Sequence, residues 1–409
     1  MNRLTTPSQA ASRTALPPPA RIVISLLEKI EGGAIRLVLP DKSTFLVGQG
    51  VERVTLQINN LAMFSACLAK GDIGFAESWL AHDWECEDLA TLLTLLAKNR
   101  QPLARAVHGK WLPVLWYRLK HLMHNNTKKG SKRNILAHYD LGNAFYAQWL
   151  DPSMTYSAAL LDPTTSTDIA DDALENAQRK KYRRILESLA PKAGDKILEV
   201  GCGWGGFAEM ATLEYGCIVH GITLSPSQLS WATERARKNG FSAQASFALT
   251  DYRDIRGQYD HIVSIEMFEA VGEKFWPAYF TRLKLALKPT GKIALQTITI
   301  DNARFDTYRR GTDFIQQYIF PGGMLPSPEA FERRVASADF FIHDAYAFGL
   351  GYAETLAHWR RRFLAAWPNI KTLGFDERFR RLWLFYLAYC EAGFRSQATD
   401  VYQYVLTHK

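Results

Sequence analysis

The sequence predicts an α/β protein in which a doubly wound parallel sheet follows a smaller N-terminal α+β domain. Three observations lead to this expectation. Strand and helix patterns alternate through the C-terminal part, a glycine-rich turn follows the first of these strands, and short alternating apolar runs mark the N-terminal part. At 409 residues the chain is long enough for two or three domains, each with its own core.

The N-terminal part divides into a tail and a small domain. Residues 1–19 are rich in Ser, Thr, Pro and Ala and are expected to be a disordered tail. Residues 20–99 are expected to form the α+β domain, with strands at 34–39 and 44–47 between Gly- and Asp-rich breaks and a largely helical stretch at 61–96. No catalytic constellation stands out there, so an accessory or lipid-handling role is the expectation.

Residues 100–133 form a basic, aromatic linker. From Gln101 to Arg133 there are eight Lys or Arg residues and no acidic residue, with Trp111, Trp116 and Tyr117 interleaved, in a chain of net charge +8. This composition is typical of a segment that lies on an anionic membrane surface. The alternative is a solvated linker helix whose aromatic residues pack on a neighbouring domain.

The expected location follows from what the chain lacks. No run approaches the roughly 18 apolar residues of a membrane-spanning helix, and the start has no signal-like apolar core. Five cysteines without CxxC spacing favour core thiols in a reducing compartment and predict no metal site. We therefore expect a cytoplasmic protein that associates peripherally with the inner face of the membrane. A homodimer is a further expectation.

The region 134–409 carries the alternating pattern of the predicted sheet. Because strands alternate with helices, right-handed βαβ units and a parallel sheet follow. The expected strands are 196–200, 218–222, 246–249, 261–265 and 292–298, and the expected helices are 208–215 and 226–239.

The glycine-rich turn after the strand at 196–200 indicates a ligand site. Gly201, Gly203 and Gly205 allow the backbone to approach a ligand that a Cβ would block. The spacing also fits a dinucleotide fingerprint, but that site expects an acidic residue at the end of the second strand, and 218–223 has none. The acidic residue instead precedes the turn, at Glu199, as in class I methyltransferases.

From about residue 135 onward the chain resembles the cyclopropane-fatty-acyl-phospholipid synthase family, which is related to the mycolic acid methyltransferases. The N-terminal domain and linker resemble the bacterial members that act on phospholipids. The matching stretches are 138–143 (HYDLGN), 154–157 (MTYS), 177–178 (AQ), 198–206 (LEVGCGWGG), 221–225 (GITLS), 228 (Q), 251–254 (DYRD), 267–269 (MFE), 318–322 (YIFPG) and 394–395 (FR).

The resemblance implies S-adenosylmethionine as the cofactor and the class I methyltransferase form of the doubly wound sheet. The implied binding residues are Tyr156, Ser157, Glu199, Gly201, Gly203, Gly205, Ile222, Thr223, Gln228 and Tyr252. Tyr156 and Ser157 would close over the methionine carboxylate, and Gln228 would serve the ribose. Strand-end packing is the alternative for Ile222 and Thr223.

The implied reaction is methyl transfer to the double bond of an unsaturated acyl chain of a membrane phospholipid. Transfer leaves a carbocation, which aromatic faces and carboxylates stabilise. A base must then remove a proton from the new methyl group so that a ring can close. In the family a bound bicarbonate does this, held by a cysteine, a glutamate, a histidine, an isoleucine backbone and a tyrosine.

Two of the implied bicarbonate ligands are replaced in this chain. Glu269, Ile298 and Tyr352 match the family pattern, whereas Ala158 stands for the cysteine and Gln296 for the histidine. We therefore predict that bicarbonate is not used and that Glu269, or a water it positions, takes the proton. The alternative is that Gln296 still hydrogen-bonds bicarbonate and the ring closes.

Three alternatives differ from this expectation in product or in function. A relative that methylates without ring closure would give a methylene- or methyl-branched chain. A nucleic-acid methyltransferase is disfavoured because 265–269 reads Ile-Glu-Met-Phe-Glu where a base-flipping motif is expected, so no nucleic acid is expected as partner. A non-catalytic lipid-binding protein is disfavoured by the intact glycine turn and Glu269.

Overall fold

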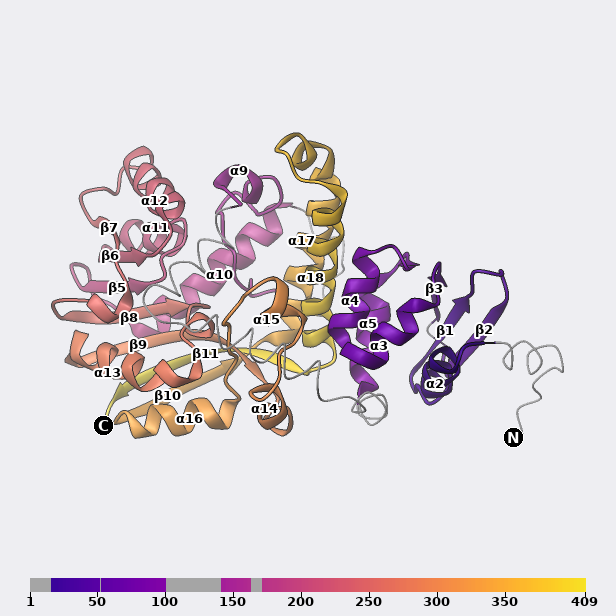
Figure 1. The fold of residues 1–409 in the computed structure, drawn as a ribbon. Coiled ribbons are helices and arrows are strands. Elements are labelled where there is room, and N and C mark those ends of the chain that lie inside the picture. The colour runs from indigo at the N-terminus through magenta and orange to yellow at the C-terminus, as the bar shows by residue number, and fades with distance from the viewer. Residues whose placement is uncertain (1–15, 52, 101–140, 163–170) are drawn as a thin grey trace.

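The computed structural model describes residues 16–51, 53–100, 141–162 and 171–409 and arranges them around two sheets (Figure 1). The basic linker at 101–133, most of the expected tail and the start of the motif at 138–143 lie outside the described residues. Among the described helices, none combines the length and apolar character that crossing a membrane requires.

The N-terminal unit is a four-stranded sheet with strand order β2-β1-β3-β4 and helices beside it. Strand β1 lies between β2 and β3, antiparallel to β2 and parallel to β3. Val54, Leu56 and Ile58 alternate with exposed residues along β3, which gives the sheet one buried face. The elements are α2 (Pro18–Leu27), β1 (Gly33–Val38), β2 (Thr44–Gln49), β3 (Arg53–Ile58), α3 (Ala62–Lys70), α4 (Asp72–Leu80), β4 (Trp84–Cys86) and α5 (Leu89–Lys98).

The second sheet has seven strands in the order β10-β11-β9-β8-β5-β6-β7. Strands β5 to β9 are parallel, as predicted, whereas β11 is antiparallel to both of its neighbours and was not predicted. The strands are β5 (Lys196–Val200), β6 (Ile218–Thr223), β7 (Ala245–Leu249), β8 (Tyr259–Ile265), β9 (Leu287–Ile300), β10 (Phe340–Ala347) and β11 (Thr399–His408).

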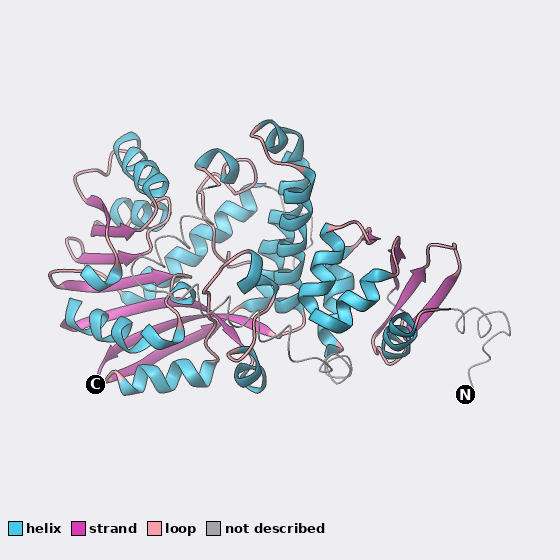
Figure 2. Cartoon of the chain, viewed as in Figure 1, coloured by secondary structure: helices cyan, strands magenta, loops and turns pink. Residues whose placement is uncertain are grey.

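Helices cover both faces of this sheet (Figure 2). Successive residues of β5 point to opposite faces, so Ile197 packs with α10 and α11 while Leu198 packs with α13 and α16. The expected doubly wound fold is therefore confirmed. The helices are α9 (Asn143–Tyr146), α10 (Asp171–Leu189), α11 (Gly206–Leu213), α12 (Pro226–Lys238), α13 (Trp276–Ala286), α14 (Asn302–Tyr308), α15 (Phe314–Tyr318), α16 (Pro328–Ser337), α17 (Gly349–Thr372) and α18 (Glu377–Arg395), with 3₁₀ turns at Tyr252–Asp254, Phe268–Ala270 and Glu273–Phe275.

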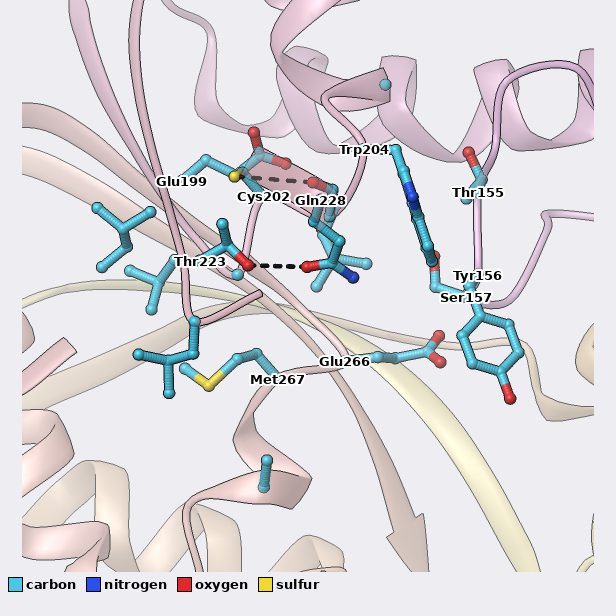
Figure 3. A pocket seen from close by; sticks show the side chains of 18 of the residues that line it. Thr155, Tyr156, Ser157, Glu199, Cys202, Trp204, Thr223, Gln228, Glu266 and Met267 are labelled. Carbon is cyan, nitrogen blue, oxygen red and sulfur yellow. Dashed lines mark hydrogen bonds between the residues drawn. The ribbon is translucent and has the colours of Figure 1, made fainter. Parts of the chain in front are cut away.

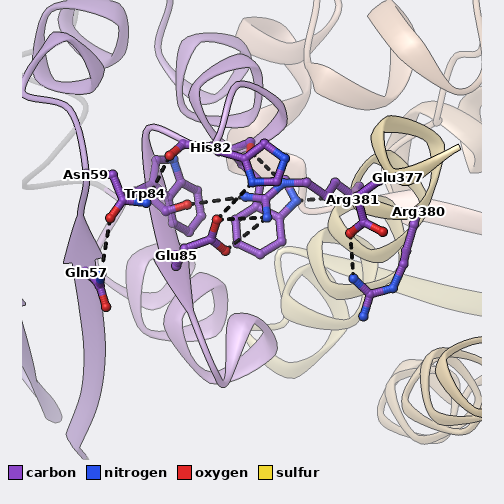
Figure 4. Close-up of polar contacts among 9 residues, drawn as sticks. Gln57, Asn59, His82, Trp84, Glu85, Glu377, Arg380 and Arg381 are labelled. Carbon is purple, nitrogen blue, oxygen red and sulfur yellow. Dashed lines mark hydrogen bonds and ion pairs between the residues drawn. The ribbon is translucent and has the colours of Figure 1, made fainter.

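The hairpin of α17 and α18 joins the two units. Trp383 and Phe385 of α18 belong to the same buried cluster as Trp79 and Trp84 of the N-terminal unit. Arg381 crosses this junction: its guanidinium contacts both carboxylate oxygens of Glu85 at 2.9 and 3.0 Å and lies 3.7 Å from the centre of the Trp79 ring (Figure 4). The N-terminal unit is thus fixed against the helical hairpin of the larger unit.

Candidate active site

One pocket lies at the carboxyl ends of β5, β6 and β8, where doubly wound sheets bind ligands (Figure 3). The strands bring together side chains from the loop after α9, the glycine turn and the ends of β6 and β8. Of the residues predicted to bind the cofactor, Gly205 lies outside the lining. Those in the lining are Tyr156, Ser157, Glu199, Gly201, Gly203, Ile222, Thr223, Gln228 and Tyr252.

The glycine turn is built to leave space in this pocket. The amides of Gly201 and Cys202 donate to the Ile222 carbonyl at 2.9 and 3.0 Å, which ties the turn to the end of β6. Gly203 has φ +51°, and a Cβ built there would meet no described atom within 4 Å. The space beside Gly203 is therefore open to a ligand. Gly205, by contrast, would press a Cβ to 3.2 Å from Ala232, so its role is to let α12 pack closely.

The end of β6 presents a hydrogen-bonded pair to the pocket. The Thr223 hydroxyl donates to Gln228 Oε1 at 2.8 Å and accepts from the Ser225 amide at 3.1 Å. Gln228 is fixed at the start of α12 because the Ser225 hydroxyl caps that helix. A neutral amide thus stands where a dinucleotide site would have a carboxylate. Tyr252 closes this end of the pocket and packs on Tyr279 with ring centres 5.2 Å apart.

Glu199 brings a buried carboxylate to the opposite side of the glycine turn. Its side chain is 3% exposed, and Oε2 has no hydrogen-bond partner among the described residues. Burial raises its pKa well above the ordinary value, although the charges of Lys181 and Arg235 oppose this. An unpartnered carboxylate oxygen lining a pocket is suited to a cationic group of a ligand.

Glu266 is the centre of the second half of the site, and the sequence analysis did not identify it. Its Oε1 accepts from the Ala158 amide at 2.8 Å and from Gln296 Nε2 at 2.7 Å, and its Oε2 accepts from the Tyr352 hydroxyl at 2.6 Å. Glu266 follows β8 with φ +50° and lines the pocket. Burial raises its pKa, while these hydrogen bonds act in the opposite direction.

The residues predicted to hold bicarbonate thus divide between two carboxylates. Ala158, Gln296 and Tyr352 surround Glu266, whereas the Ile298 amide donates to Glu269 Oε1 at 2.5 Å. Glu269 lies outside the pocket lining, and burial, followed by the charge of Glu266, raises its pKa to about 8. Gln296 is itself oriented by Gln403, which donates to its Oε1 at 3.0 Å.

Comparison with known proteins gives a consistent result. The family model described as mycolic acid cyclopropane synthetase matches residues 126–404. Tuberculostearic acid methyltransferase UfaA1 of Mycobacterium tuberculosis is 40% identical, covering 82% of this chain and 79% of its own. Cyclopropane-fatty-acyl-phospholipid synthase of Escherichia coli K12 is 34% identical, covering 86% and 87%.

The solved structures that resemble this chain include two cyclopropane synthases. The cyclopropane synthase MmaA2 of Mycobacterium tuberculosis superimposes with a TM-score of 0.61 at 29% identity, covering 67% of this chain and 97% of its own. The mycolic acid cyclopropane synthase CmaA1, solved with SAH and CTAB, also has a TM-score of 0.61 at 29% identity, covering 68% of this chain and 98% of its own.

Proposed function

Because this chain belongs to the mycolic acid cyclopropane synthetase family of S-adenosylmethionine-dependent methyltransferases, we propose that it methylates the double bond of an unsaturated fatty acyl chain carried by a membrane phospholipid. The name of the Escherichia coli relative supports the phospholipid substrate. The observation that carries the proposal is the Glu266 carboxylate, held by three donors at the edge of the cofactor pocket.

The residues of the pocket fit S-adenosylmethionine. Glu199 has an unpartnered oxygen for the ammonium of its methionine part, Gly203 leaves the space beside the turn open, and Gln228 offers an amide to the ribose. Tyr252 would border the adenine, and Tyr156 with Ser157 would border the methionine end. When bound, the cofactor supplies an electrophilic methyl group on a positively charged sulfur.

The chain's own residues must manage the charge that methyl transfer creates. The π electron pair of the alkene forms the new carbon–carbon bond, and the neighbouring carbon of the acyl chain is left as a cation. The Glu266 carboxylate and a group of aromatic rings stabilise that cation. In this group the centre of the Tyr156 ring lies 5.2 Å from that of Trp359 and 5.4 Å from that of Tyr146. Glu266 then accepts a proton from the new methyl group, which neutralises the acyl chain.

In this proposal Glu266 replaces bicarbonate, the base that removes the methyl proton in the family that the sequence resembles. The backbone amide of residue 158, the side chain at 296 and the Tyr352 hydroxyl would each be available to an anion, but here they donate to Glu266. A carboxylate belonging to the chain leaves no need for a dissolved one. Glu269, the base expected from the sequence, does not receive these three donors: its Oε1 accepts from the Ile298 amide and the Thr297 hydroxyl.

The order of two steps decides the product. Proton loss from the new methyl group directly after transfer closes a cyclopropane ring. If a hydride first moves from the methylated carbon to its cationic neighbour, the same proton loss gives a methylene branch. We propose the methylene product, because both family ligands are replaced by residues that serve Glu266 and because the relative named tuberculostearic acid methyltransferase is 40% identical. A saturated methyl branch would need a separate reductant.

Mass spectrometry of lipids from a host that makes monounsaturated phospholipids tests the product. We expect methylene-branched acyl chains, and a cyclopropane as sole product would overturn this choice.

Glu266→Gln should abolish turnover while S-adenosylhomocysteine still binds in calorimetry, and Glu269→Gln should retain more activity. Activity in carbonate-depleted buffer should not rise when bicarbonate is added. An active Glu266→Gln enzyme beside an inactive Glu269→Gln enzyme would return the base to Glu269.

We also propose that the segment 101–133 docks the enzyme on anionic lipid at the inner face of the membrane. Its eight cations without an acidic residue support this proposal. The segment lies outside the described residues.

A further inference from the structure

A buried lysine stands behind the methionine end of the pocket. Lys181 of α10 is 0% exposed, and its Nζ donates to the Ser157 hydroxyl at 2.6 Å and to Gln178 Oε1 at 2.8 Å. Among the described residues no carboxylate lies within ion-pair distance of it, although the charges of Glu266, Asp151 and Glu199 are near enough to favour its protonated form. Burial lowers its pKa to about 7. Burying an ammonium without a carboxylate to pair with it is costly, which indicates a function.

The lysine determines which way the Ser157 hydroxyl acts. A lysine ammonium has only donors, so the Ser157 oxygen must accept from it and the hydroxyl hydrogen is left for another acceptor. No acceptor for that hydrogen is recorded in the described part of the chain, and Ser157 lines the pocket. Gln178 fixes the backbone by donating to the Ser157 carbonyl at 2.9 Å. The pocket therefore presents a hydroxyl donor backed by a cation, which suits an anionic group.

We propose that Lys181 is a positioning residue that acts through Ser157 to hold the carboxylate of the cofactor's methionine part. The inference rests on the proposed placement of the cofactor. If the adenosine end lies at Thr223 and Gln228, the methionine part would lie towards Glu199 and Ser157, which line the same pocket. Glu199 would then face the ammonium and the Lys181–Ser157 pair the carboxylate, so that each charge of the amino acid would meet an opposite charge.

Two ligands that differ by one carboxylate test the proposal. Decarboxylated S-adenosylmethionine keeps the adenosine, the sulfonium and the amine, and calorimetry gives its affinity beside that of S-adenosylmethionine. The wild type should prefer S-adenosylmethionine by about tenfold to a hundredfold, the range of a charge-assisted hydrogen bond. Lys181→Met should remove most of this preference while leaving the affinity for the decarboxylated ligand unchanged. That retained affinity shows that the variant is folded.

Two further variants sharpen the result. Ser157→Ala should reduce the same preference. Combining it with Lys181→Met should reduce the preference little further, because both changes remove the same Lys181–Ser157 hydrogen bond. Lys180→Met, an exposed neighbour on the same helix, should match the wild type. An equal loss of affinity for both ligands in Lys181→Met would assign the lysine to folding, and a wild type without preference would place the carboxylate elsewhere; either result overturns the inference. The lipid product is measured independently, so the proposed reaction stands or fails separately.

Discussion

Replacing Arg381 by methionine should loosen the junction between the two units. Arg381 Nε donates to the Trp79 carbonyl at 2.8 Å and Nη2 to the Trp84 carbonyl at 3.3 Å, in addition to its contacts with Glu85. The side chain of Arg381 is 6% exposed and that of Glu85 is 38% exposed. Methionine retains the apolar stem of the side chain but none of its donors.

The expected loss follows from these contacts. Because Glu85 can be hydrated again, the ion pair contributes about 1 kcal/mol. The two carbonyls lose donors at about 1 kcal/mol each, and the contact with the Trp79 ring adds about 1 kcal/mol. Since such terms are not additive, we expect the free energy of unfolding to fall by about 3 kcal/mol.

Urea unfolding followed by tryptophan fluorescence measures this change, because Trp79 and Trp84 lie in the junction. The matched control is Arg380→Met: Arg380 pairs with Glu377 on the same helix and lies 5.9 Å from the centre of the Trp367 ring, and the loss should be about 1 kcal/mol or less. If the two variants lost the same stability, Arg381 would not be the anchor of the N-terminal unit.

Three further predictions concern binding. Gly203→Val should abolish cofactor binding in calorimetry, because its side chain enters open pocket space, and should also lower stability, because φ at this position is +51°; binding as tight as in the wild type would refute the assignment. Replacing the basic residues at 128, 129, 132 and 133 by Gln should weaken sedimentation with anionic vesicles, most clearly at low salt, and unchanged sedimentation would leave the segment a linker. The preference for S-adenosylmethionine over its decarboxylated form should fall as the pH rises from about 6 to about 8. The reason is that Lys181, whose pKa burial lowers to about 7, loses its charge in this range. In Lys181→Met the preference should not change with pH.

Local patterns were sufficient for the centre of the catalytic fold. The apolar runs of β5, β6 and β8 end at glycine or polar residues, and this punctuation located both the strands and the pocket at their ends. The antiparallel strands β10 and β11 were missed because their pairing depends on partners far away in the chain: Thr399 of β11 pairs with Ile300 of β9. Pairing at such separation leaves no local signal.

Glu266 was missed for a related reason. The resemblance directs attention to Glu269, three residues later, and the five-residue stretch was used only to exclude a nucleic-acid substrate. What distinguishes Glu266 is its donors, which lie 108, 30 and 86 residues away along the chain. The replacement of two expected bicarbonate ligands, by Ala158 and Gln296, was the one sequence feature that could have led to Glu266. A chain that lacks these ligands would need another residue to supply the base.

The attachment of Glu266 to the backbone has a kinetic consequence. A reagent taken from solution is present in the site only for the fraction of time that its concentration allows, whereas a tethered group is always there. Well-oriented intramolecular groups reach effective molarities of about 10⁵ M or more, far above any solute in a cell. Because the Ala158 amide, Gln296 and Tyr352 fix both oxygens of Glu266, its orientation is set before the acyl chain arrives. If Glu266 is the base, as proposed, the rate of the final proton transfer would not depend on the concentration of bicarbonate in the cell.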